Sequence, residues 1–171
     1  MTRLPVRLVA LLVAIAAVAG ACGGGTDVEG VQGSAIEPIP PEAVPSRIQD
    51  LTVRVEDMSK QLALAEDTYV RSAGVFSLRA GELVQATLQV TRFTEDFDYQ
   101  DSEARTSLAN RLGGSRAQVL RLGEDTVYLT QGQRQRLALW FRGAYLYILS
   151  TRRDYAKPRS LLRSTLEVEV A

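Results

Sequence analysis

The chain contains no histidine, and its single cysteine is Cys22. Without histidine, neither a Ser-His-Asp nor a Cys-His nucleophile system can be assembled, and zinc sites lose their commonest ligand. A lone cysteine cannot form an internal disulfide, so the fold must depend on packing. A glycine-rich phosphate loop is also missing, because Gly113 and Gly114 end a predicted helix instead of preceding one. We therefore expect a protein that is not an enzyme, with no catalytic residues, no cofactor and no bound metal ion.

Lysine and long hydrophobic runs are scarce as well. Only Lys60 and Lys157 are lysines among the 20 basic residues, and 20 acidic residues balance them. A nucleic-acid-binding protein would need a clear basic excess, so we expect no nucleic-acid partner. The longest apolar run, Leu8 to Ala21, falls short of the roughly 20 residues that span a bilayer. A run of this length near the N-terminus is typical of a cleaved secretory signal.

The first 25 residues combine a basic start, an apolar run and a cysteine. Arg3 and Arg7 lie before the run, and the small residues Ala19 to Ala21 lead into Cys22 and three glycines. This order resembles the signal peptide and lipobox of bacterial lipoproteins, although a larger aliphatic residue usually stands in place of Ala19. The arginine-rich composition and the Cys-Gly-Gly-Gly start are similar to those of actinobacterial members. The domain that follows resembles no family that we recognise from the sequence.

The resemblance implies that cleavage leaves Cys22 as the first residue of the mature chain, bearing a diacylglycerol with acyl chains such as palmitate. Two acyl chains make a durable anchor, at about 0.8 kcal/mol for each buried CH2 group. The implied location is the extracytoplasmic face of the cell membrane, which is then the first partner of the protein. An ordinary secretory signal followed by a chance cysteine is the alternative.

Composition divides the chain into three parts. Residues 1–21 are the expected signal peptide, residues 22–45 the lipidated cysteine with a flexible tether, and residues 46–171 a single domain. The tether is rich in glycine in its first half and in proline in its second, a composition that cannot bury enough apolar area to fold alone. The size of the remaining chain is typical of one domain.

Residues 46–69 carry a helical pattern. Apolar residues from Ile48 to Tyr69 recur at alternating spacings of three and four. Such a helix could form a coiled-coil stalk that dimerises the chain, or it could pack on the sheet of its own domain, which we favour. A competing local prediction makes Leu51 to Val55 a strand.

From Tyr69 onward the apolar period is two, which is typical of strands. The predicted strands are 75–79, 83–93, 116–122, 126–130, 134–141 and 144–151, and further helices are predicted at 101–112 and 158–166. The short connections favour antiparallel pairing. We therefore expect an α+β fold of the order helix-β-β-helix-β-β-β-β-helix, in which helices cover a largely antiparallel sheet of about six strands.

Arg134, Arg136 and Trp140 share one face of a predicted strand, opposite Leu137 and Leu139. Tryptophan and arginine dominate interaction hot spots, so these residues are a candidate protein-interaction surface. A carbohydrate platform is an alternative use of the same face. The third interpretation is that both faces of the sheet are buried, one under each helix layer.

Arg152 and Arg153 begin a basic group that continues with Lys157, Arg159 and Arg163. On a membrane-tethered domain, this group could contact anionic headgroups or an acidic partner. The simpler interpretation is a solvated strand end and helix face.

An acidic stretch runs from Glu95 to Glu103. It does not complete a calcium-binding loop, because Asp101 stands where the EF-hand pattern requires glycine and Ser107 where it requires glutamate. We expect a solvated loop whose last acids favour the N-terminus of the next helix.

These features predict a membrane-anchored extracytoplasmic lipoprotein that acts as a non-enzymatic binding or accessory module for an envelope protein or component. The alternative is a carrier of an apolar ligand, such as a lipid, held between the sheet and its helices. The carrier requires a cavity, whereas a binding module requires an exposed surface. A hydrolase that depends on carboxylates is a third, weaker hypothesis.

Overall fold

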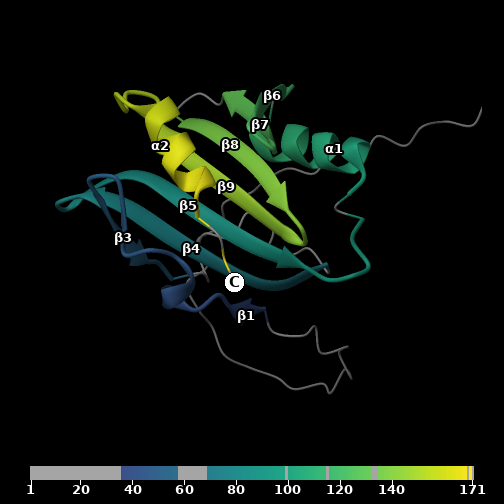
Figure 1. Ribbon diagram of the computed structural model, residues 1–171, viewed down its shortest axis with the longest axis horizontal. Coiled ribbons are helices and arrows are strands. Elements are labelled where there is room, and N and C mark those ends of the chain that lie inside the picture. Colours follow the sequence, from purple (N-terminus) through teal and green to yellow (C-terminus); the bar gives the residue numbers. More distant parts are fainter. Residues whose placement is uncertain are drawn as a thin grey trace, which may run out of the picture. The chain divides into compact units, whose positions relative to one another are not determined.

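The computed structural model describes residues 36–57, 69–98, 100–114, 116–131, 135–168 and 170. In these ranges the chain forms a sheet of nine strands, two α-helices and one short 3-10 helix (Figure 1). The expected signal peptide, Cys22 and most of the expected tether lie outside the described residues. In the described part, neither α-helix combines the length and apolarity needed to cross a membrane.

The strands are antiparallel to their neighbours, except at the first one. They are β1 Glu37–Pro38, β2 Arg47–Ile48, β3 Leu51–Val55, β4 Val70–Ala80, β5 Leu83–Phe93, β6 Gln118–Leu122, β7 Asp125–Gln131, β8 Gln135–Arg142 and β9 Tyr145–Arg152. Their order across the sheet is β2-β3-β4-β5-β9-β8-β7-β6, and β1 pairs in parallel with the start of β4. The helices are η1 Pro41–Ala43, α1 Ser102–Gly113 and α2 Pro158–Leu166.

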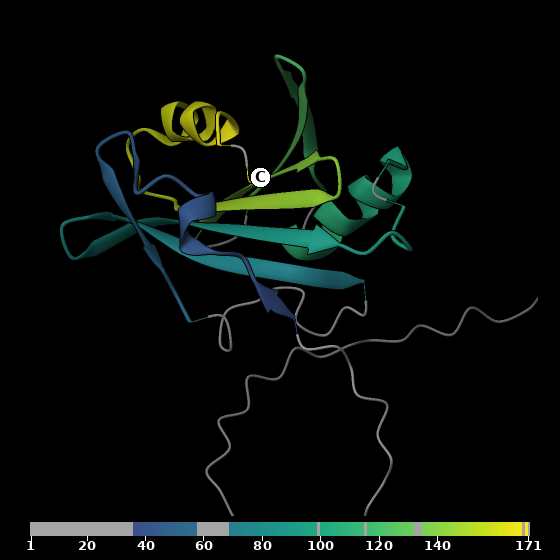
Figure 2. The ribbon, with the colours of Figure 1, turned by 60° about the horizontal axis from the view of Figure 1, so that its bottom comes forward.

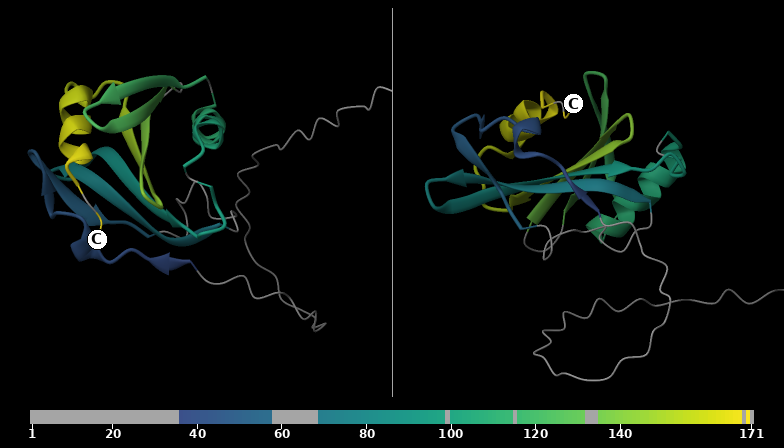
Figure 3. Two further views of the ribbon diagram at one scale, coloured as in Figure 1. Left: turned by 45° about the vertical axis from the view of Figure 1, so that its right-hand side comes forward. Right: turned by 90° about the horizontal axis from the view of Figure 1, so that it is seen from below.

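Alternate residues of the central strands point to opposite sides of the sheet, and each side contains a cluster of buried residues. In β8, Ala138 and Trp140 belong to the cluster that packs under α2. Leu139 and Phe141 of the same strand belong to the cluster that packs under α1. We call these sides the α2 face and the α1 face. The β6–β7 hairpin rises from the sheet on the same side as α2 (Figures 2 and 3).

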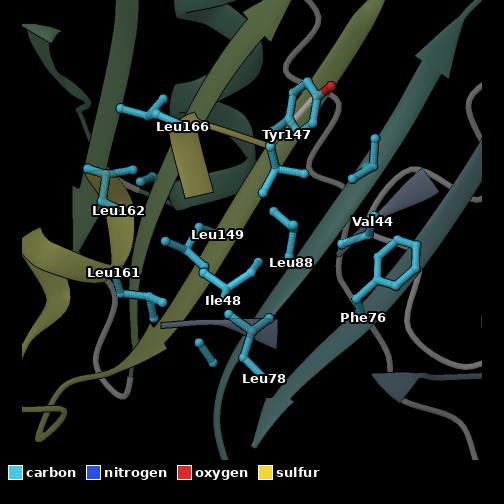
Figure 4. Packing of buried hydrophobic residues seen from close by; sticks show 14 of the residues in the cluster. Val44, Ile48, Phe76, Leu78, Leu88, Tyr147, Leu149, Leu161, Leu162 and Leu166 are labelled. Atoms are coloured by element: carbon cyan, nitrogen blue, oxygen red, sulfur yellow. The ribbon is translucent and has the colours of Figure 1, made fainter. Parts of the chain in front are cut away.

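The last helix follows its sequence pattern closely. Pro158 begins α2, where its missing N–H is not needed, and Leu161, Leu162 and Leu166 are buried. These leucines lie over Leu149 and its neighbours on the strands (Figure 4). The prediction of a helix over residues 158–166 is confirmed.

The predicted helix over residues 46–69 is wrong in its first part. Arg47–Ile48 and Leu51–Val55 form the β2–β3 hairpin, as the competing strand prediction proposed for the second segment. The rest of this prediction, residues 58–68, lies outside the described residues. The three-four spacing alone predicts a helix, but the second segment pairs as β3 with the end of β4, where Val53 lies opposite Leu78. Local helix propensity is overridden by such pairing.

The predicted boundary between tether and domain is also wrong. Ile39 and Val44 are buried in the α2-face cluster, and the Ile39 N–H donates to the carbonyl of Ala73 at 2.8 Å. Proline does not prevent this packing, because Pro38 lies on a short edge strand and Pro41 begins η1. The described part of the domain therefore starts before residue 46.

The expected architecture is confirmed in part. The structure has a single, largely antiparallel sheet, and each of the six predicted strands is present, 83–93 with the predicted ends and the other five with shifted ends. The sheet has nine strands instead of about six, and the described residues form two α-helices instead of three. The domain is thus mostly β, with one helix on each face.

Candidate functional site

Trp140 is completely buried, so the predicted Trp140 interaction surface is wrong. The indole lies in the α2-face cluster and stacks on Tyr147, with ring centroids 5.2 Å apart and planes 8° apart. The alternative interpretation, in which both sheet faces are buried, is confirmed at this position. The physical reason is that β8 lies inside the sheet, paired with β7 and β9, and each face has its own helix.

The four arginines predicted as interaction residues, Arg134, Arg136, Arg152 and Arg153, do not form one surface among the described residues. Arg134 lies outside the described residues. Arg136 points to the α2 face with Thr151, whereas Arg152 pairs with Gln135 and points to the other face. Arg152 donates to Asp154 at 2.7 Å, and this hydrogen bond lowers the pKa of the exposed Asp154 carboxyl below its usual range. Arg153 is exposed in the turn that follows β9.

The α2 face is hollowed between α2 and the strands β6 to β9. The cleft has a volume of about 570 Å³, which lies within the range of small-molecule sites. Its apolar lining includes Ala138, Leu149 and Leu162, which also belong to the α2-face cluster. Three arginines also line it: Arg116, Arg136 and Arg159.

The cleft exists because α2 is held along one side and at one end. The Gln49 amide, in the β2–β3 turn, donates to the hydroxyls of Ser160 and Ser164 at 2.7 and 2.9 Å. Among the described residues, β8 forms side-chain hydrogen bonds to this part of the chain through Arg142, at the C-terminal end of α2. Trp140 and Tyr147 fill the α2 face farther along β8 and β9, but the small Ala138 leaves space near the start of the helix.

The C-terminal end of α2 is fixed by Arg142. Its guanidinium donates to both carboxylate oxygens of Asp125, at 3.0 and 2.8 Å, and to the backbone carbonyls of Leu166 and Val168. Arginine suits this position because its planar fork serves a carboxylate and carbonyls together. The clamp ties the β6–β7 hairpin to the helix end and so fixes two walls of the cleft.

Positive charge gathers around the cleft. None of the described lining residues is acidic. Within the described ranges, no ion pair involves Arg116, Arg136 or Arg159. The first turn of α2 also contributes, since it has no acidic residue and Lys157 provides no side-chain cap. The partial positive charge of this helix end adds to that of the arginines.

The acidic stretch serves the start of α1. Asp101 is the N-cap and accepts from the backbone N–H groups of Glu103 and Ala104, as the sequence predicts for a helix that begins here. Asp98 accepts from the N–H groups of Gln100 and Asp101. Across the described stretches of the chain, no three His, Cys, Asp or Glu side chains gather as metal ligands would.

Sequence reasoning missed the cleft because its lining comes from separate elements. Arg116 precedes β6, Arg136 lies on β8 and Arg159 lies on α2, so no local motif unites them. The one available signal was Ala138, a small residue between Arg136 and Trp140 on the same face of a strand.

No family model matches the chain, and no curated protein matches it. Among solved structures, the chain is similar to a GTP-binding regulator from Thermotoga maritima, with 17% sequence identity and a TM-score of 0.45. The match covers 71% of this chain and 78% of that one. A likeness of this degree assigns no family.

Proposed function

We propose that this chain is a membrane-anchored extracytoplasmic lipoprotein that acts as a non-enzymatic binding module, with the cleft beside α2 as its binding site. The lipobox-like sequence before Cys22 supports the anchor. The single observation that supports the binding site is a preformed cleft of about 570 Å³ with an apolar floor. This combines the binding-module and carrier hypotheses, and it favours a ligand with an apolar part.

The distribution of exposed apolar residues favours such a ligand over a folded protein partner. Trp140 is buried, and the large exposed hydrophobic residues of the described chain are Val55, Tyr69, Leu83 and Val119. They lie on β3, in the turn before β4, at the start of β5 and on β6, so they offer no single hot-spot cluster. The α2 cleft instead offers the half-buried Leu129 and Leu137 within a concave site, which is the usual form of a small-ligand pocket.

The chemistry of the lining supports binding without catalysis. The described lining combines aliphatic side chains with arginine, glutamine and threonine, and contains no carboxylate, cysteine or histidine. Such a set can orient and neutralise a ligand, but it provides no general base of the usual kinds. The role we propose is therefore to hold a ligand close to the membrane.

The test is to fill the cleft from its floor. In Ala138→Leu the added atoms enter the cleft, so the ligand should be lost while the fold is retained. Native mass spectrometry of the full-length protein, extracted gently from its own membranes, should show a lipid-sized mass beyond the covalent anchor for the unaltered chain and not for the variant.

The matched control is Ala80→Leu, which adds the same atoms at an exposed position at the end of β4. This variant should keep the ligand. A ligand that persists in Ala138→Leu with unchanged occupancy would contradict the assignment of the cleft. An unaltered protein that never carries a ligand would contradict the binding function itself.

A further inference from the structure

Among the described residues, the three arginines of the cleft take part in no ion pair. Some described arginines do contact acids: Arg79 lies 3.4 Å from Glu56, and Arg142 and Arg152 bind Asp125 and Asp154. The chain has as many acidic as basic residues. A basic excess of the whole chain therefore does not explain why three arginines line one cleft without an acidic residue beside them.

We propose that the ligand of the α2 cleft is an anionic lipid, whose phosphate or carboxylate binds Arg116, Arg136 and Arg159 while its acyl chain lies on the apolar floor. This inference rests on the proposed function, because it takes the cleft as the binding site. It adds the chemical class of the ligand and the residues that select it.

The positions of the arginines suit an anionic group. They come from three elements around one cleft, the run before β6, β8 and the first turn of α2, so they can approach an anion from different directions. A guanidinium donates two parallel hydrogen bonds to phosphate or carboxylate oxygens. Gln118 and Gln131 line the same cleft and add amide donors. The uncapped first turn of α2 favours negative charge at the same end.

The apolar lining of the cleft favours a lipid over a free anion. Free phosphate would need only the arginines, and it would leave the half-buried Leu129, Leu137 and Pro158, which also line the cleft, in contact with water. An acyl chain would remove their apolar surface from water, which is favourable in proportion to the area covered. A domain anchored at Cys22 would also be held next to a supply of lipids. The geometry therefore points to a molecule with both an anionic head and an apolar tail.

The experiment compares three probes with the full-length protein in a nonionic detergent. Oleoyl lysophosphatidate carries the head and the tail, monooleoylglycerol carries the same tail without charge, and glycerol 3-phosphate carries the head alone. The unaltered protein should bind oleoyl lysophosphatidate about tenfold or more tightly than monooleoylglycerol, as expected for a charge-assisted contact. Glycerol 3-phosphate should bind more weakly than oleoyl lysophosphatidate.

The triple variant Arg116→Gln, Arg136→Gln and Arg159→Gln should lose this preference while its affinity for monooleoylglycerol stays the same. The matched control is Arg47→Gln, Arg71→Gln and Arg163→Gln. It removes the same charge at exposed positions that do not line the cleft, and it should keep the preference.

Equal affinities for the charged and the uncharged lipid in the unaltered protein would overturn this inference and leave the proposed function standing. So would a preference that survives in the triple variant. Glycerol 3-phosphate that binds as tightly as oleoyl lysophosphatidate would overturn the choice of a lipid. Failure of both lipids to bind would contradict the proposed function.

Discussion

The two faces of the sheet are packed in different ways, although the same strands supply both. On the α1 face, Phe93 stacks on Phe97 with ring centroids 4.2 Å apart, Phe141 lies beside Phe93, and Arg105 covers the Phe141 ring at 5.0 Å. On the α2 face, Trp140 stacks on Tyr147, and the cleft occupies the part around Ala138. One face is closely packed, and the other contains a cleft.

The approach of each helix explains the difference. α1 comes so close to β7 that a Cβ on Gly113 would collide with the side chain of Thr130. α2 is held by Gln49 on its β2–β3 side and by Arg142 at its C-terminal end, and the cleft lies between the N-terminal half of α2 and the part of β8 around Ala138. Helix–sheet contact thus depends on where the helix is fixed as well as on its apolar face.

The largest effect is expected from Trp140→Ala, which would break the closed part of the α2 face. Removal of a completely buried indole should lower the free energy of unfolding by about 3–5 kcal/mol. Urea unfolding followed by far-UV circular dichroism measures this. Tryptophan fluorescence cannot be used, because the variant loses the one tryptophan of the chain. A loss below about 1 kcal/mol would indicate an exposed Trp140 and restore the interaction surface expected from the sequence.

The Arg142 clamp should have the next largest effect. Arg142→Gln removes the charged hydrogen bonds to Asp125 and to the last carbonyls of α2, each kind worth about 1.5–3 kcal/mol. We expect faster hydrogen exchange of the α2 amides, with little change in α1. Asp125→Asn is the companion variant, which should loosen α2 less because Arg142 can still donate to the carbonyls. Equal exchange changes in both helices would contradict a local clamp.

Gly113→Ala tests the close packing of the α1 face. The added methyl group would overlap Thr130, and overpacking of this kind costs about 1–3 kcal/mol. The double variant Gly113→Ala with Thr130→Ala makes room for the methyl group and should recover part of the loss. Urea unfolding of both variants measures the coupling. A fully additive result would mean that Thr130 does not limit how closely α1 approaches.

Much of the fold follows from local signals. Pro158 and the buried leucines predict α2 correctly, Asp101 predicts the start of α1, and alternating residues predict the six longer strands. The β2–β3 hairpin could not be predicted in this way, because its stabilising partner is β4, beyond residues 58–68 in the chain.

The candidate site was much less accessible from the sequence. Alternation correctly placed Arg136 and Trp140 on one face, but it does not show whether that face is covered. Burial of Trp140 depends on tertiary packing with α2, which follows β9 in the chain, and alternation along one strand does not reveal this packing. The cleft depends on the same tertiary contacts, and only Ala138 hints at it locally.

The central claim is that the open half of the α2 face binds an anionic lipid while the α1 face remains unchanged. Methyl NMR of leucine-labelled protein, titrated with oleoyl lysophosphatidate, tests it directly. The account predicts shifts for Leu149 and Leu162, which line the cleft, and none for Leu139 and Leu146, which are buried on the α1 face. Shifts confined to the α1-face leucines, or an absence of shifts at saturating lipid, would contradict it.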